Sequence, residues 1–180
     1  MLAPVLAWLA WNRPSGAAMG ACLIAAFLSD IFDGVIARRL GIATPGLRRL
    51  DSVADSIFYV AALLAVWHLQ PQAITARVPW LAVLGTLELL RYALDLARFR
   101  REASYHMWSS KLWGIALFAG FLALLGFGAD NALADGAVLL GIVADLEGLA
   151  ISLVLPAWQP DVPSLVHALR IRRASRPRGA

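Results

Sequence analysis

The chain has a single cysteine, Cys22, and few charged residues of either sign. One cysteine excludes an internal disulfide, and the absence of CxxC or Cys/His spacing excludes a structural zinc site. Only 16% of the 180 residues are charged, against about a quarter in an average soluble domain. Apolar residues make up 60% of the chain, and the mean hydropathy is +0.69. This composition indicates a domain that lies in a lipid bilayer.

Five apolar stretches of suitable length follow one another along the chain, at 15–37, 53–70, 78–97, 108–128 and 132–156. Each is close to the roughly 20 residues that a helix needs to cross the hydrocarbon core. A helix is the expected form, because a single span must satisfy its own backbone hydrogen bonds in lipid. We therefore predict an all-α fold, a polytopic bundle of about six transmembrane helices with a polar cavity that faces the cytoplasm.

One further apolar stretch precedes these five, at residues 1–11, and it is short for a span. Counting it as the first stretch gives six helices. Either this helix is partial or the natural chain starts further upstream. The stretch has no positively charged start, so we do not interpret it as a signal peptide. We expect a transmembrane domain over residues 1–160 and a basic cytoplasmic tail over 161–180, with a short helix near 163–171.

The basic residues are distributed unevenly between the two sides of this layout. Of the sixteen Lys and Arg residues, all but Arg13 and Arg77 fall on one side. By the positive-inside rule that side is cytoplasmic. We therefore expect an integral protein of the inner, cytoplasmic membrane with both termini facing the cytoplasm. Because topology accounts for the net charge of +4, no nucleic-acid partner is required. The basic tail also fits attraction to anionic lipid, and topology alone explains it equally well.

Four carboxylates occupy positions where a membrane helix normally has none. Asp30 and Asp33 are three residues apart near the end of the second stretch, and Asp51 and Asp55 are four apart at the start of the third. Each pair shares one helical face, and a short loop makes the two helices antiparallel neighbours. Simple helix capping is the plain alternative and suits Asp51 best. Four such carboxylates at helical spacing favour a functional site, because intramembrane charges are costly.

The expected site needs positive charge to balance the carboxylates. Four facing carboxylates do not all stay ionised without a counter-ion. Hard divalent cations with oxygen ligands supply that charge, and a pair of them suits phosphoryl transfer. Gly34 and Ala37 leave room for a bulky ligand, and Arg38 is placed to reach a phosphate.

These residues resemble the signature of the CDP-alcohol phosphatidyltransferase family. That signature reads D-x-x-D-G-x-x-A-R and, after a fixed gap, G-x-x-x-D-x-x-x-D. It is matched by Asp30, Asp33, Gly34, Ala37, Arg38, Asp51 and Asp55. The second glycine departs from it, because Gly46 stands one position early and Leu47 occupies the expected place.

The resemblance implies an enzyme of phospholipid biosynthesis that transfers a phosphatidyl group from CDP-diacylglycerol to a small alcohol and releases CMP. Asp30, Asp33, Asp51 and Asp55 would hold two Mg²⁺ or Mn²⁺ ions, and Asp55 would also be the general base. Asp30, Gly34, Ala37 and Arg38 would bind the donor. Members of the family are commonly homodimers.

Acceptor binding is predicted for Arg91, His106 and Lys111. For His106, a structural role at the membrane interface is the plain alternative. Arg91 and Lys111 could bind an acceptor phosphate, or instead pair with Glu88 or Asp95 or extend to the interface. Asp145 and Glu147 lie inside the last apolar stretch and either pair with basic residues of neighbouring helices or meet a cationic headgroup.

Two other classes of protein remain as alternatives. A transporter would place its polar sites nearer the midplane of the membrane, whereas these aspartates cluster at one end. A catalytically silent family member that binds divalent cations is the other alternative, although all four aspartates are present.

Overall fold

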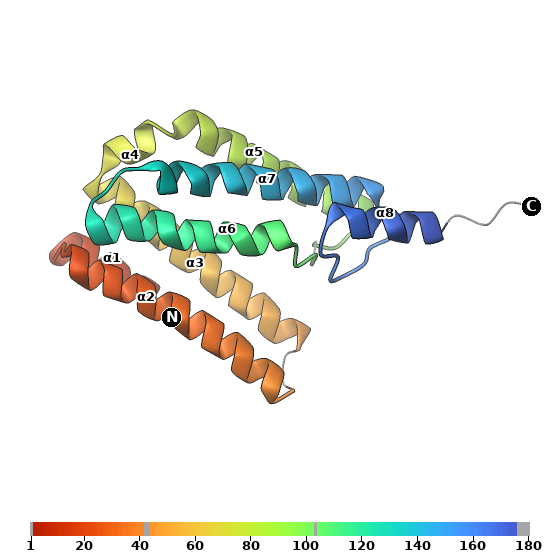
Figure 1. The fold of residues 1–180 in the computed structure, drawn as a ribbon, viewed down its shortest axis with the longest axis horizontal. Helices are drawn as coiled ribbons and strands as arrows, with labels where there is room; N and C mark the ends of the chain where they lie inside the picture. Colours follow the sequence, from red (N-terminus) through yellow and green to blue (C-terminus); the bar gives the residue numbers. More distant parts are fainter. Residues whose placement is uncertain (1, 42–43, 103, 176–180) are drawn as a thin grey trace, which may run out of the picture. The chain divides into compact units, whose positions relative to one another are not determined.

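The structure is a computed structural model that describes residues 2–41, 44–102 and 104–175. The side chains of Arg38, Pro45 and Arg48 lie outside the described part. The described residues form helices and connections without any β-strand, which confirms the predicted all-α class (Figure 1). In chain order the elements are α1 (Ala3–Asn12), α2 (Gly16–Arg39), α3 (Pro45–Leu69), α4 (Pro71–Thr75), α5 (Val78–Phe99), α6 (Trp108–Phe121), the π-helix η1 (Leu122–Gly126), α7 (Ala132–Val154) and α8 (Leu165–Ala174).

Four helical stretches of the described residues are long and apolar enough to cross a membrane. They are Gly16–Ala37, Arg49–Leu69, Trp108–Gly126 and Ala132–Val154. Helix α1 has only 10 residues. Helix α5 has 22 residues but carries Glu88, Arg91 and Asp95 along its length. The count of six membrane helices therefore stays a prediction, and so does the polar cavity.

Local sequence explains where several helices begin and end. Thr44 caps α3, because its hydroxyl accepts a hydrogen bond of 3.2 Å from the backbone N–H of Leu47. Proline at the first helical position follows in α3 and α4, where its missing N–H costs nothing. After α2, the chain turns at Gly41, whose φ of 68° favours glycine.

The chain divides into two compact units, and the first comprises residues 1–76 and 118–134. In this unit α1 packs against both α2 and α3, and η1 packs against α2. Leu6, Leu23, Val66 and Leu125 are almost fully buried in its apolar core. The first unit is therefore held together by α1 and η1, which both contact the helices that carry the four aspartates.

Glycines allow the close approach of α2 and η1. The Cα atom of Gly20 would lie 3.4 Å from a Cβ at Gly126, and a Cβ at Gly16 would overlap the carbonyl oxygen of Gly126. Small residues at such contacts are typical of packing between membrane helices. The π-helical turn also leaves a carbonyl at Leu124, which accepts a hydrogen bond of 2.7 Å from the side chain of Gln70.

The second unit comprises residues 77–117 and 135–180. Its buried apolar cluster includes Tyr105, Met107, Ile151 and Leu155, so the connection after α5 is packed against the end of α7. The helix that we predicted in the basic tail is present as α8, and its Ala168 is buried in the same cluster.

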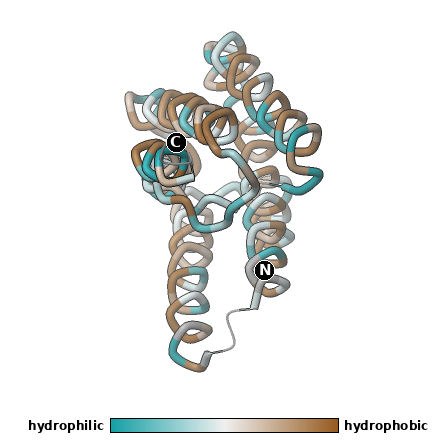
Figure 2. The backbone as a smooth tube through the Cα atoms, turned by 90° about the vertical axis from the view of Figure 1, so that its right-hand side faces the viewer, coloured by the Kyte–Doolittle hydropathy of each residue, from teal (hydrophilic) through white to brown (hydrophobic). Residues whose placement is uncertain are grey.

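Large apolar side chains are exposed along the long helices of both units. Val60, Leu64 and Leu153 each have more than half of their surface exposed, and apolar residues dominate the length of these helices (Figure 2). Exposed apolar surface on this scale is unusual for a soluble protein. It is expected where lipid tails cover the helices.

Candidate active site

The four aspartates lie in the first unit, at the ends of α2 and α3 that are joined by residues 40–44. Asp30 and Asp55 are half-buried, whereas Asp33 and Asp51 are exposed. At the opposite end of α3, His68 stacks on Trp11 of α1, with ring centroids 4.7 Å apart. The connection 40–44 thus brings both acidic pairs to one end of the unit.

Electrostatic interactions link these carboxylates across the two helices. Asp30 interacts with Asp33 on its own helix and with Asp51 on α3. Asp55 interacts with both Asp30 and Asp51. Like charges this close repel each other and favour the binding of a cation between them. Asp30, Asp51 and Asp55 thus interact across the two helices, and a joint metal site of all four aspartates stays a prediction.

The donor set fits a hard divalent cation, because carboxylate oxygens are the ligands that Mg²⁺ and Mn²⁺ prefer. Within the described residues, no three His, Cys, Asp or Glu side chains form a group that could hold a metal ion. One of the carboxylates has a local partner, since the hydroxyl of Ser29 donates a hydrogen bond of 3.3 Å to Asp33.

The predicted donor-binding residues follow the aspartates along α2. Gly34 and Ala37 are both partly exposed, and their lack of bulk leaves this stretch of the helix narrow. The side chain of Arg38 lies outside the described part of the structure, so its predicted contact with a phosphate stays a prediction.

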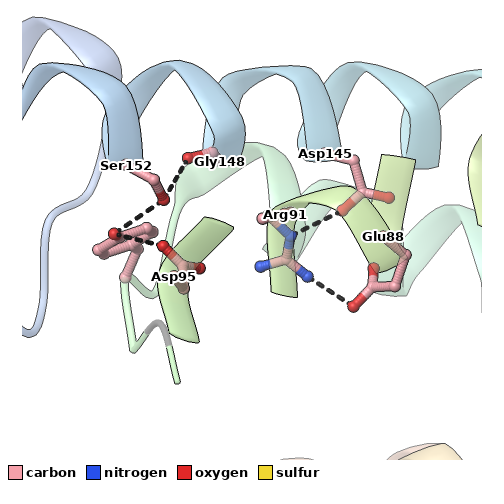
Figure 3. Close-up of polar contacts among 7 residues, drawn as sticks. Glu88, Arg91, Asp95, Asp145, Gly148 and Ser152 are labelled. Atoms are coloured by element: carbon pink, nitrogen blue, oxygen red, sulfur yellow. Dashed lines mark hydrogen bonds and ion pairs between the residues drawn. The ribbon is translucent and has the colours of Figure 1, made fainter. Parts of the chain in front are cut away.

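Arg91 in the second unit is held between two carboxylates (Figure 3). Its Nη2 lies 2.6 Å from Glu88 Oε1 on the same helix, and its Nε lies 3.1 Å from Asp145 Oδ1 on α7. The side chain of Asp145 is only 2% exposed. Gly148 makes room for this arrangement, because a Cβ there would lie 2.7 Å from the Cδ atom of Arg91. Of the two alternatives for Asp145, the structure shows pairing with a basic residue.

A second buried polar group lies one turn further along α5 and involves residues that the sequence did not single out. The Tyr105 hydroxyl donates a hydrogen bond of 3.4 Å to Asp95 and lies 3.0 Å from the Ser152 hydroxyl (Figure 3). Burial raises the pKa of the Tyr105 hydroxyl above its usual value, which keeps the proton available for these contacts. A lone tyrosine and a lone serine gave no signal in the sequence, because neither belongs to a spaced motif.

Glu147 takes a different role from Asp145. It accepts a hydrogen bond of 2.6 Å from the Ser109 hydroxyl on α6 and one of 3.0 Å from the backbone N–H of Leu165. The carboxylate therefore accepts a hydrogen bond from the first backbone N–H of α8, which has no partner within the helix. The two alternatives that we gave for this acid were a basic residue or a cationic headgroup, and the structure instead gives Glu147 a hydroxyl and a backbone N–H as partners.

The other two predicted acceptor-binding residues also have partners in the second unit. His106 Nε2 lies 3.6 Å from Asp161 Oδ1, and the His106 backbone has a positive φ of 49°. Lys111 Nζ lies 4.4 Å from the centre of the Trp108 ring. Both side chains are exposed, so these contacts leave them accessible to a ligand.

Fold and site define a class of protein: an integral membrane protein, helical in its described residues, with carboxylates grouped at the end of two neighbouring helices. The family model for CDP-alcohol phosphatidyltransferase matches residues 1–155, and the chain belongs to this family. Its members are transferases of substituted phosphate groups that use a CDP-alcohol donor and an alcohol acceptor in a lipid membrane, generally with a divalent metal. No curated protein and no solved structure gives a match.

Proposed function

We propose that this protein transfers the phosphatidyl group of CDP-diacylglycerol to a small alcohol and releases CMP. The observation that carries the proposal is the grouping of Asp30, Asp51 and Asp55 from two helices at one end of the first unit. Family membership supports a donor with a CDP group. The membrane-spanning helices favour a donor with acyl chains, because such a molecule already lies in the bilayer.

The four aspartates have two tasks in this reaction. Asp30, Asp33, Asp51 and Asp55 would hold Mg²⁺ or Mn²⁺, two ions per site, which neutralise the pyrophosphate of the donor when bound. Asp55 is the general base, and it is half-buried beside the charges of Asp30 and Asp51. A carboxylate at this position suits a base that takes the proton of the attacking alcohol.

The bonds change as follows. The acceptor oxygen forms a bond to the phosphorus that carries the diacylglycerol, and the bond from that phosphorus to CMP breaks with its electron pair on CMP. The proton of the acceptor passes to Asp55. Gly34 and Ala37 admit the cytidine because they have almost no side chain, and Arg38 binds a donor phosphate.

Arg91, His106 and Lys111 are proposed to bind the acceptor. Glu88 and Asp145 hold the guanidinium of Arg91 in one orientation, and a preoriented arginine suits a phosphate. This favours a phosphorylated alcohol such as glycerol 3-phosphate or an inositol phosphate. The active site and both termini face the cytoplasm in this proposal, where such acceptors are found, and the protein is a homodimer.

The test is CMP release by the purified protein with CDP-diacylglycerol and a panel of glycerol 3-phosphate, inositol phosphate, inositol, serine and choline, each with magnesium or with EDTA. We expect CMP with one phosphorylated alcohol and none with EDTA. CMP with an uncharged acceptor alone would contradict the role of Arg91. No CMP with any acceptor, nor with CDP-choline or CDP-ethanolamine and diacylglycerol, would contradict the proposed reaction and favour a silent member.

A further inference from the structure

Helix α8 lies beyond residues 1–155, which the family model matches, and it is built into the second unit. Its first backbone N–H, at Leu165, donates to Glu147, about two turns before the end of α7, and Ala168 is fully buried. The preceding segment is attached as well, because Pro163 accepts a hydrogen bond of 3.1 Å from the backbone of Trp108. The helix therefore has a defined position against the candidate membrane span α7.

This attachment sets the position of α8 along α7. Glu147 lies about 10 Å along the helix axis before α7 ends at Val154, given a rise of 1.5 Å per residue. From there α8 runs beside the last turns of α7 and past its end (Figure 1). The first turn of α8 thus lies beside the last two turns of the candidate span α7, and its last turn lies beyond Val154.

The exposed residues of α8 change character along the helix in the same order. Val166 and Leu169, near its start, are 55% and 38% exposed. The basic residues come at its end, where Arg170, Arg172 and Arg173 are all exposed. Apolar surface followed by cationic surface is the order in which a leaflet presents acyl chains and then phosphates.

The end of α5 adds further arginines at this level. Arg98 Nη2 donates a hydrogen bond of 2.9 Å to the carbonyl of Leu155, the residue after α7 ends. Arg101 lies over the ring of Trp158, 5.2 Å from its centre. Six exposed arginines lie on α8 and at the end of α5, namely Arg98, Arg100, Arg101, Arg170, Arg172 and Arg173.

The exposed acids near these six arginines are Glu102 and Asp161, which are too few to balance the charge. A net positive surface remains at the end of the candidate span α7, where we expect lipid phosphates, which arginine can bind with paired hydrogen bonds.

We propose that α8 and the C-terminal end of α5 form a binding surface for the headgroups of anionic lipids in the leaflet at that end of the protein. The occupant is a lipid and not a soluble phosphate, because apolar Val166 and Leu169 are exposed on the same helix beside the arginines. This proposal does not depend on the transferase reaction.

The test uses the full chain reconstituted in phosphatidylcholine bilayers with a trace of spin-labelled phosphatidylglycerol or spin-labelled phosphatidylcholine. The fraction of motionally restricted label reports how many lipids of each kind contact the protein. We expect a preference for phosphatidylglycerol that weakens as salt is added, since the attraction is electrostatic. In the variant with Arg170→Gln, Arg172→Gln and Arg173→Gln, the preference for phosphatidylglycerol over phosphatidylcholine should fall by roughly ten-fold or more.

The matched control is Arg13→Gln, which removes an exposed arginine in the first unit and should leave the preference almost unchanged. Thermal unfolding of each variant in detergent shows whether it is folded, and the lipid measurement needs no turnover. An equal preference in the wild type and the triple variant would overturn the proposal. An equal loss per charge removed in the triple variant and in Arg13→Gln would do so too, because it would show that only net charge matters.

Discussion

At the scale of single residues, the buried pair of Arg91 and Asp145 shows how one cation keeps a carboxylate inside a membrane helix. Asp145 is 2% exposed and has Arg91 Nε at 3.1 Å. Removing one partner of a buried pair leaves an uncompensated charge, which costs about 3–5 kcal/mol. We expect Arg91→Leu to lower the thermal unfolding temperature in detergent markedly.

The double variant Arg91→Leu with Asp145→Asn should recover most of that loss, because neither charge remains buried alone. Arg13→Leu, at an exposed position, serves as the control and should have little effect. If the double variant is no more stable than Arg91→Leu, the loss comes from packing of the arginine stem and not from its charge.

Gly34 tests the proposed donor site. A leucine there would fill the space beside Asp33 that the cytidine needs. We expect Gly34→Leu to raise the KM for CDP-diacylglycerol by about ten-fold or more, since pockets reject misplaced methylene groups on that scale. The matched control is Gly85→Leu on α5, where a Cβ meets open space. Equal effects of the two changes on KM would contradict the assignment of Gly34.

At the scale of elements, the contact between α2 and η1 depends on glycine. A Cβ at Gly16 would overlap the carbonyl oxygen of Gly126, so Gly16→Ala forces the two helices apart. Overpacking of this kind costs about 1–3 kcal/mol. The expected result is a lower unfolding temperature, measured in detergent by the fluorescence of a thiol-reactive dye as buried Cys22 becomes accessible.

Gly136→Ala on α7 is the counterpart, because a Cβ there meets nothing within 4 Å. Alanine favours the helix over glycine by up to about 1 kcal/mol, so this variant should be as stable as the wild type or slightly more stable. A stable Gly16→Ala variant would show that α2 and η1 do not pack as described.

The length of the apolar runs predicted most of the helices, because such runs separated by proline and glycine are strong signals for membrane helices. It did not predict the π-helical turn η1 or its link to Gln70, since neither leaves a mark in hydropathy. It also did not distinguish Asp145 from Glu147. Both are acids in one apolar stretch, and only the neighbouring helices decide that one meets Arg91 and the other meets Ser109.

At the scale of the whole molecule, the distribution of basic residues predicts an orientation in the membrane. In a Cys22→Ala background, Ser175→Cys should react with an impermeant thiol reagent only from the cytoplasmic side. Gln72→Cys should react only from the opposite side. Both positions are exposed, and labelling after permeabilisation controls for reactivity. Labelling of both variants from one side would contradict the proposed topology.

The candidate site was predictable in part for a physical reason. Spacing along a helix places Asp30 beside Asp33 and Asp51 beside Asp55, and a short connection returns the chain to the same end. The structure adds that Asp55 interacts with charges on both helices. Acceptor binding depends on side chains from several helices, and no single spacing in the sequence encodes it.

The central claim is that the grouped aspartates carry out metal-dependent release of CMP, with Asp55 as the base. The most direct measurement compares CMP formation from CDP-diacylglycerol and the best acceptor by the wild type, Asp55→Asn and the control Asp130→Asn, each with magnesium. We predict wild-type rates for Asp130→Asn and a loss of about 100- to 10,000-fold for Asp55→Asn, the range that a general base contributes. Rates for Asp55→Asn within a few-fold of the wild type would contradict the account.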